Sequence, residues 1–148
     1  MPLLRAVGKV RVVFRYFPLS IHPWARGAAD AASCAQEQGD RYFWSLHDYL
    51  FEHQKEITVE SVQRRLLGQA AGVPGFDTKK FEDCLDTRAG AARVDADLAF
   101  GKEIGVNGTP AIFVNGQQVN GYRPDQIRTL VRETTEGASV PTPPAEAR

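Results

Sequence analysis

A proline placed directly before a short apolar run is the feature that most restricts how this chain can fold. The segment GVNGTPAIFVNGQQVNG, residues 105–121, puts Thr109-Pro110 before Ala111–Val114, and Asn115-Gly116 follows. Proline cannot donate to a strand ladder, so it belongs on an edge, at a first strand residue or at a bulge. It is also nearly the only residue that takes a cis peptide bond at modest cost. Asn-Gly is the strongest two-residue hairpin signal, a type I′ turn. The segment alone therefore predicts a hairpin whose first strand opens on Pro110.

Composition excludes several classes of protein. The chain has 148 residues, 43% of them hydrophobic and 24% charged, as is usual for one soluble globular domain. Its 18 basic and 18 acidic residues give no net charge, so nothing points to nucleic acid or a membrane surface as a partner. No apolar run is long enough to span a bilayer, and the first eight residues do not resemble a signal peptide.

A strand is predicted over residues 9–17, KVRVVFRYF, between Gly8 and Pro18. The run is rich in β-branched and aromatic residues, and its apolar positions alternate as a strand requires. Arg11 and Arg15 share one face, which favours an outer strand over a fully buried one.

The segment from residue 23 to about residue 105 is predicted to be helical. One helix runs from Pro23 to Gly39, and a second covers DRYFWSLHDYLFEHQ. A third helix follows an N-cap at Thr58, with Ser61 in the position of the capping-box acid. A fourth helix follows Asp77, and a fifth ends at Gly105. A last helix follows Pro124 to about Thr134, and the proline-rich tail, 135–148, is predicted to be disordered. An early strand and a late hairpin separated by helices indicate an α/β fold with an inserted helical lobe.

In this order, the motifs GKVRVVFRYFPL, AADAASCAQEQGDRYFWSLHDYLFEHQ, FEDCLD and GVNGTPAIFVNGQ strongly resemble the DsbA-like branch of the thioredoxin fold. The resemblance covers about residues 2–134, so it implies one domain over 1–134: the strand at 9–17, an inserted helical lobe over about 23–105, and a hairpin with the last helix over 106–134. It implies a bacterial-type thiol–disulfide oxidoreductase, acting on unfolded or cysteine-containing client polypeptides, with an extracytoplasmic or periplasmic location.

The resemblance also gives Pro110 a role. In this family the corresponding proline forms a cis peptide bond, and its loop faces the active site. An extended client can then pair with the exposed backbone of the preceding residue, here Thr109, by strand addition. By resemblance, Thr109 and Pro110 are the substrate-binding residues.

The family's redox motif has no counterpart in these residues. Its members exchange disulfides through a Cys-x-x-Cys at the start of the first helix, where the thiol pKa is lowered. This sequence holds two cysteines, Cys34 and Cys84, and neither belongs to such a motif. Pro2-Leu3-Leu4 resembles the later part of that first helix, so the chain is expected to begin just downstream of the motif and to lack the strand before it. No catalytic residue is assigned.

Cys34 and Cys84 have three interpretations: buried reduced thiols, a catalytic pair, or a structural disulfide within the helical lobe. Some DsbA-like relatives resemble this chain in carrying a second cysteine pair there, which favours the disulfide. Such a bridge requires Cα atoms about 4.4–6.8 Å apart and an oxidising compartment.

No metal or cofactor is expected. The three histidines, His22, His47 and His53, do not share a helix face, and a metal site would need more convergent ligands. GVNG is followed by a strand and not by a helix, so it is not a phosphate loop. The histidines are interpreted as turn or packing residues.

Three functional classes stay open. The first is a DsbA-like oxidoreductase whose Cys-x-x-Cys is absent from this chain, which would be inactive as it stands. The second is a non-catalytic thioredoxin-fold protein that binds peptides or is complemented by a partner. The third is the glutathione-transferase-like branch of the same fold, whose diagnostic serine position is also missing here.

Loss of the first core strand would leave two rows of backbone groups unpaired between residues 10–17 and 111–114, at about 1–3 kcal/mol for each buried group. We expect either that these flanking strands pair directly, or that another chain donates a strand, most simply in a homodimer.

Overall fold

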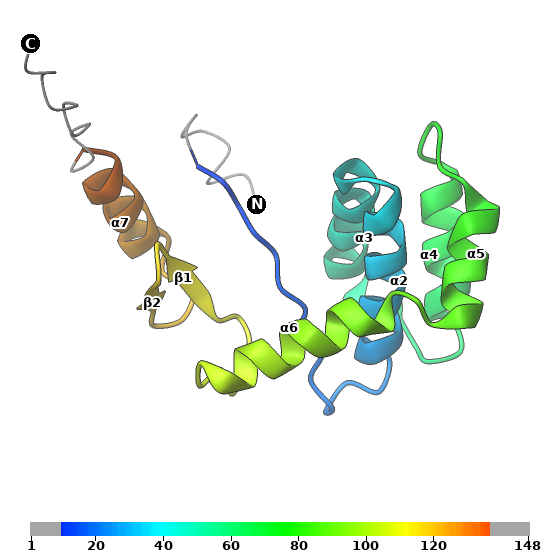
Figure 1. The fold of residues 1–148 in the computed structure, drawn as a ribbon, viewed down its shortest axis with the longest axis horizontal. Helices are drawn as coiled ribbons and strands as arrows, with labels where there is room; N and C mark the ends of the chain where they lie inside the picture. The colour runs from blue at the N-terminus through cyan, green and yellow to red at the C-terminus, as the bar shows by residue number, and fades with distance from the viewer. Residues whose placement is uncertain (1–9, 137–148) are drawn as a thin grey trace, which may run out of the picture. The chain divides into compact units, whose positions relative to one another are not determined.

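A computed structural model gives the structure of residues 10–136. These residues divide between two compact units (Figure 1). One unit is the continuous segment 14–107. The other is formed by the residues up to 13 together with those from 108 onward. Each unit has its own core, and the two are described separately.

The continuous unit, here the helical unit, contains five α-helices and one short 3₁₀ helix (Figure 1). In chain order these are α2 (Ala25–Gln38), α3 (Asp40–Glu52), η1 (Gln54–Glu56), α4 (Val62–Ala71), α5 (Thr78–Thr87) and α6 (Ala91–Glu103). They occupy the segment in which the sequence predicts helices. The predicted cap at Asp77 is confirmed, because its side chain accepts a hydrogen bond from the Lys80 amide over 3.0 Å.

Helix α2 lies at the centre of the helical unit and packs against α3, α4, α5 and α6. Its buried face consists of small side chains, which let neighbouring helices approach closely: Ala28, Ala31, Ala32, Ser33, Cys34 and Ala35. Larger groups from the surrounding helices fill the core, with Leu46, Leu66 and Phe81 fully buried. At Gly39 φ is +139°, a conformation that favours glycine, and the chain turns there directly from α2 into α3.

A disulfide joins α2 to α5 inside this core. Cys34 and Cys84 are bonded with their Cα atoms 5.8 Å apart, within the range that the sequence-based expectation required. The α5–α6 connection passes directly over the bridge. A Cβ at Gly90 would lie 2.8 Å from the Asp30 carbonyl oxygen and 3.0 Å from Cys34 Sγ, so only glycine fits there without displacement.

The strand expected over 9–17 is not formed in the described part of that segment, residues 10–17. These residues follow an extended course (Figure 1), but they belong to no ladder. A polar side chain takes the place of a neighbouring strand: the Tyr16 amide donates to Asp97 Oδ2 of α6 over 3.0 Å. Arg15 Nη1 donates to the other oxygen of this buried carboxylate over 2.7 Å. Within the hairpin unit, residues 10–13 do not pair with 111–114. Strand donation by another chain stays a prediction.

The hairpin unit contains β1 (Ile112–Val114), β2 (Gln117–Val119) and α7 (Pro124–Glu136). The strands are antiparallel, with Ile112 opposite Val119 and Val114 opposite Gln117. Asn115 and Gly116 both have positive φ, 48° and 84°, which confirms the predicted turn. Val119 and two residues of α7, Ile127 and Val131, form a small core, and Val10, Ile112, Val114 and Leu130 pack against it.

Two sequence-based boundaries need comment. Helix α7 extends to Glu136, so residues 135 and 136 belong to a helix and not to the expected tail. The remainder of that tail, residues 137–148, lies outside the described residues, as does residue 9, the first residue of the expected strand. Within residues 10–136, no helix is both long and apolar enough to cross a membrane.

We predict that Asp97→Ala lowers the free energy of unfolding of the helical unit by about 1–3 kcal/mol, because the buried Tyr16 amide then loses its acceptor. Urea denaturation followed by circular dichroism measures this change. Asp83→Ala is the matched control, since Asp83 pairs with Lys79 on the exposed surface of α5 and should cost under about 1 kcal/mol. Equal losses in the two variants would contradict the assigned role of Asp97.

We further predict that removing the disulfide lowers the free energy of unfolding by roughly 4 kcal/mol, the chain-entropy value for a loop of this length. Double replacement of Cys34 and Cys84 by alanine and reduction of the wild type should give similar losses in urea titrations. Peptide mapping without reductant should recover α2 and α5 fragments linked together. Two thiols that alkylate freely in unreduced protein would contradict the bridge.

Candidate functional site

The first strand of the hairpin unit has one edge without a strand partner. Within residues 10–136, β1 pairs only with β2. In an antiparallel pair closed by a two-residue turn, the residues that flank the turn are hydrogen bonded, and the next pair is not. Val114 and Gln117 flank this turn, so the N–H and C=O of Phe113 face the open edge of β1. One residue therefore presents both a donor and an acceptor to an incoming strand.

The residues predicted to bind substrate lie immediately before this edge. Thr109 and Pro110 are exposed, and the peptide bond between them is cis. Phe113 is 39% exposed, one of several large apolar residues that reach the surface of the described chain. Open backbone groups, an exposed aromatic ring and the Thr109-Pro110 pair thus follow one another along five residues of the chain. Such an arrangement can bind an extended polypeptide by strand addition.

The two cysteines are buried and bonded to each other, unlike the exposed thiols of a reactive pair. Both are buried, with Cys34 2% and Cys84 8% exposed, and both sulfur atoms are used in the disulfide. Free cysteines are absent from the described residues. A polar cleft of about 630 Å³ lies beside the bridge, and its lining includes Cys34, Glu37, Asp77 and Lys80.

Each of the three histidines lies against an aromatic ring. His22 stacks with Trp24 and His53 stacks with Tyr49, with ring centroids 5.6 and 4.2 Å apart. His47 lies among the rings of Phe14, Phe43, Trp44 and Phe51. The structure does not bring these histidines to a common point, and each serves packing between neighbouring segments.

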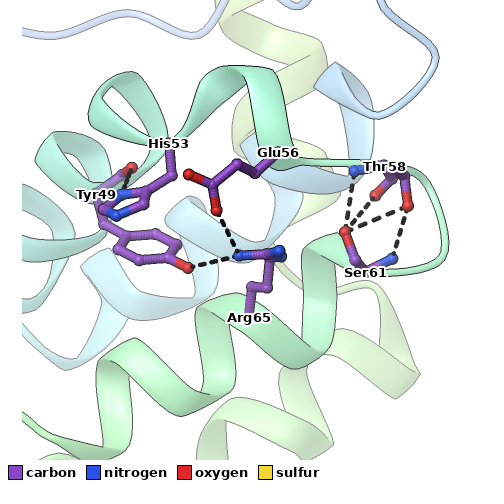
Figure 2. A network of polar contacts seen from close by, with 6 residues as sticks. All are labelled: Tyr49, His53, Glu56, Thr58, Ser61 and Arg65. Carbon is purple, nitrogen blue, oxygen red and sulfur yellow. Dashed lines mark hydrogen bonds and ion pairs between the residues drawn. The ribbon is translucent and has the colours of Figure 1, made fainter.

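A polar network connects the end of α3 with the start of α4 (Figure 2). Arg65 donates to the Tyr49 hydroxyl and to Glu56 over 3.4 and 3.2 Å, and the hydrogen bond to Tyr49 raises the pKa of Arg65. Ser61 Oγ accepts from the Thr58 amide, and Thr58 Oγ1 accepts from the Ser61 amide (Figure 2). Helix α4 begins at Val62 with Ser61 as its N-cap, so the predicted N-cap at Thr58 is wrong. These contacts lie at the surface and fix the α3–α4 connection, so we interpret them as structural.

Tyr16 is a buried ionisable residue, 3% exposed. Its hydroxyl donates to Gln36 of α2 over 3.0 Å, and burial raises the pKa of this hydroxyl well above its ordinary value. The phenol is therefore neutral and acts as a hydrogen-bond donor that joins the extended segment to α2. This is a structural role.

Sequence reasoning missed two groups at these sites. Phe113 was treated as one member of an apolar run, although the alternation of side chains in a strand and the Asn-Gly turn together give its orientation. Glu37 was not predicted as a site residue, because its position beside the cysteine bridge depends on how α2 packs against α5. Its Oε2 atom lies 3.8 Å from Cys84 Sγ.

Comparison with known proteins places the chain among its relatives. The sequence model of the family described as Thioredoxin matches residues 3–133. The Na(+)/H(+) antiporter NhaA 1 of Salinispora arenicola is 38% identical over 137 residues, which is 91% of this chain and 20% of that protein. Disulfide bond formation protein D of Bacillus subtilis is 25% identical over 136 residues, 88% of this chain and 60% of that protein.

A third relative, the Na(+)/H(+) antiporter NhaA 3 of Salinispora tropica, is 39% identical over 76% of this chain and 16% of its own length. The chain thus spans about a fifth of the length of the antiporters that it matches. No solved structure matches it. The family match covers most of the chain, and relatives named for disulfide bond formation share its helical and hairpin segments. The chain therefore belongs to the thioredoxin family, in the DsbA-like group, and its fold is of the α/β thioredoxin-like class.

Proposed function

We propose that these residues form the client-binding part of a disulfide-oxidoreductase domain, and that they have no thiol–disulfide exchange activity of their own. The observation that carries the proposal is the state of Cys34 and Cys84. They are the two cysteines of the sequence, and they form one buried bridge in the helical core. Exchange requires a thiolate that can reach a client disulfide, and no group here supplies one.

The open edge of β1 supports the binding half of the proposal. Backbone pairing at Phe113 would hold any extended segment, because main-chain hydrogen bonds are common to all sequences. The exposed Phe113 ring adds a preference for apolar client side chains, and Thr109 and Pro110 set where the paired strand begins. Weak, sequence-tolerant binding suits clients that are unfolded chains containing cysteine.

The antiporter relatives favour a second candidate, in which a domain of this kind is one part of a membrane-transport polypeptide. Matches that cover 16–20% of proteins named as antiporters motivate it. A structural disulfide also fits a location outside the cytoplasm, where such bonds persist. Reading the coding DNA in frame upstream of Met1 tests this candidate: transmembrane segments would support it, whereas a Cys-x-x-Cys alone would favour an oxidoreductase, and an in-frame stop would favour a non-catalytic protein.

We predict negligible turnover by the 148-residue chain in insulin reduction and in refolding of scrambled disulfide proteins. An oxidoreductase that contains a Cys-x-x-Cys serves as the positive control under the same conditions. The proposal fails if the chain matches this control and loses its activity when Cys34 or Cys84 is replaced by serine.

We also predict that Phe113→Asp weakens binding of a fluorescent, reduced and unfolded client peptide by about tenfold, because a charge replaces the apolar contact beside the open edge. Fluorescence anisotropy measures the affinity. Gln118→Asp is the matched control: Gln118 lies opposite Phe113 on the same face, but on β2, beside that strand's own outer edge and away from the open edge of β1. Equal affinities for the two variants would place client binding elsewhere.

A further inference from the structure

The cleft beside the disulfide is formed entirely by the helical unit. Its lining combines a sulfur-bearing residue with charged groups from two helices: Cys34 and Glu37 of α2, and Lys80 and Asp83 of α5, with Asp77 at the N-cap of α5. Cys34 therefore borders a cleft large enough for a small molecule, although Cys34 is only 2% and Cys84 8% exposed, the cleft walls included.

The charged groups around the cleft differ in how they are paired, and Arg41 adds a cation beside the lining residue Tyr42. Lys80 Nζ lies 3.9 Å from Asp77, and Asp83 pairs with Lys79 over 3.1 Å. For Glu37, the described structure shows no ion pair, and its carboxylate instead lies 3.8 Å from Cys84 Sγ. A disulfide sulfur has no proton to donate, so this contact is a negative group held against the bridge and not a hydrogen bond.

We propose that this cleft is a charge-selective entry site for low-molecular-weight thiols, at which Glu37 protects the disulfide from anionic reductants. The thiolate of the reductant attacks Cys34 Sγ, the S–S bond breaks, and Cys84 leaves as a thiolate. A second thiolate then attacks the mixed disulfide on Cys34, releasing the oxidised reductant and the Cys34 thiolate. Two thiols supply the two electrons that reduce the bridge.

Glu37 opposes this reaction at two points. It repels an anionic thiol that enters the cleft, and it lies beside the sulfur on which the leaving negative charge develops. A cationic thiol is attracted by the same group, so its attack is disfavoured only at the leaving sulfur. The rate of reduction should therefore depend on the charge that the reductant carries apart from its sulfur. Reduction through global unfolding would show no such dependence.

Three small thiols test the proposal under native conditions: cysteamine, mercaptoethanol and mercaptopropionate, which are cationic, neutral and anionic. Reduction is followed by alkylation and mass spectrometry, and each rate is divided by that for a neutral peptide disulfide. In the wild type at low salt, cysteamine should be faster than mercaptopropionate by about tenfold. Glu37→Gln should narrow this gap several-fold, whereas Glu82→Gln, an exposed substitution on α5, should leave it unchanged.

Repeating the wild-type measurement at high ionic strength gives a second test that needs no variant. Screening by salt should reduce the difference between the reduction rates with cysteamine and with mercaptopropionate. Equal corrected rates for the three thiols in the wild type would overturn the proposal, since the bridge would then open by unfolding. If Glu37→Gln keeps the wild-type difference between the corrected rates with cysteamine and with mercaptopropionate, Glu37 does not have the proposed role, however that difference depends on salt.

Discussion

Close packing around α2 is the constraint on which the helical unit depends. Small side chains along its buried face allow four helices to approach, and the bridge from Cys34 to Cys84 fixes one of them, α5, at that distance. The α5–α6 connection then passes so near the bridge that Gly90 has no room for a side chain. Because Cys34 and Cys84 are bonded to each other inside this core, the bond that helps to hold the helices together also leaves no free thiol among the described residues.

The extended segment at residues 10–17 shows how a strand-like sequence behaves when no strand lies beside it. The alternating apolar side chains of this segment are still packed against other residues. Phe14 and Tyr16 contact the aromatic cluster around Phe43, while Val10 contacts the core of the hairpin unit. Its backbone, however, obtains a partner at Tyr16 from the carboxylate of Asp97. One buried side chain thus supplies, at Tyr16, one of the hydrogen bonds that a neighbouring strand would supply.

Local signals in the sequence were sufficient where local chemistry determines structure. The Asn115-Gly116 turn and the Asp77 cap each need only a few adjacent residues, and both were predicted correctly. The disulfide was inferred from family resemblance, since spacing alone does not pair two cysteines. Of the strand predicted over 9–17, the described residues 10–17 form none, because strand formation depends on a partner that no local pattern reveals. The contacts of Asp97 and Glu37 join segments distant in sequence, so they could be found only in the folded chain.

The functional account depends on the open edge of β1, and the amide of Phe113 tests it most directly. Site-resolved hydrogen exchange should show slow exchange at Ile112 and Val114, whose amides face β2, and fast exchange at Phe113 in the free chain. Addition of a reduced, unfolded client peptide should then slow exchange at Phe113 specifically. If the Phe113 amide is already protected in the free chain, or does not respond to the client, the edge is not an available binding site and the account is contradicted.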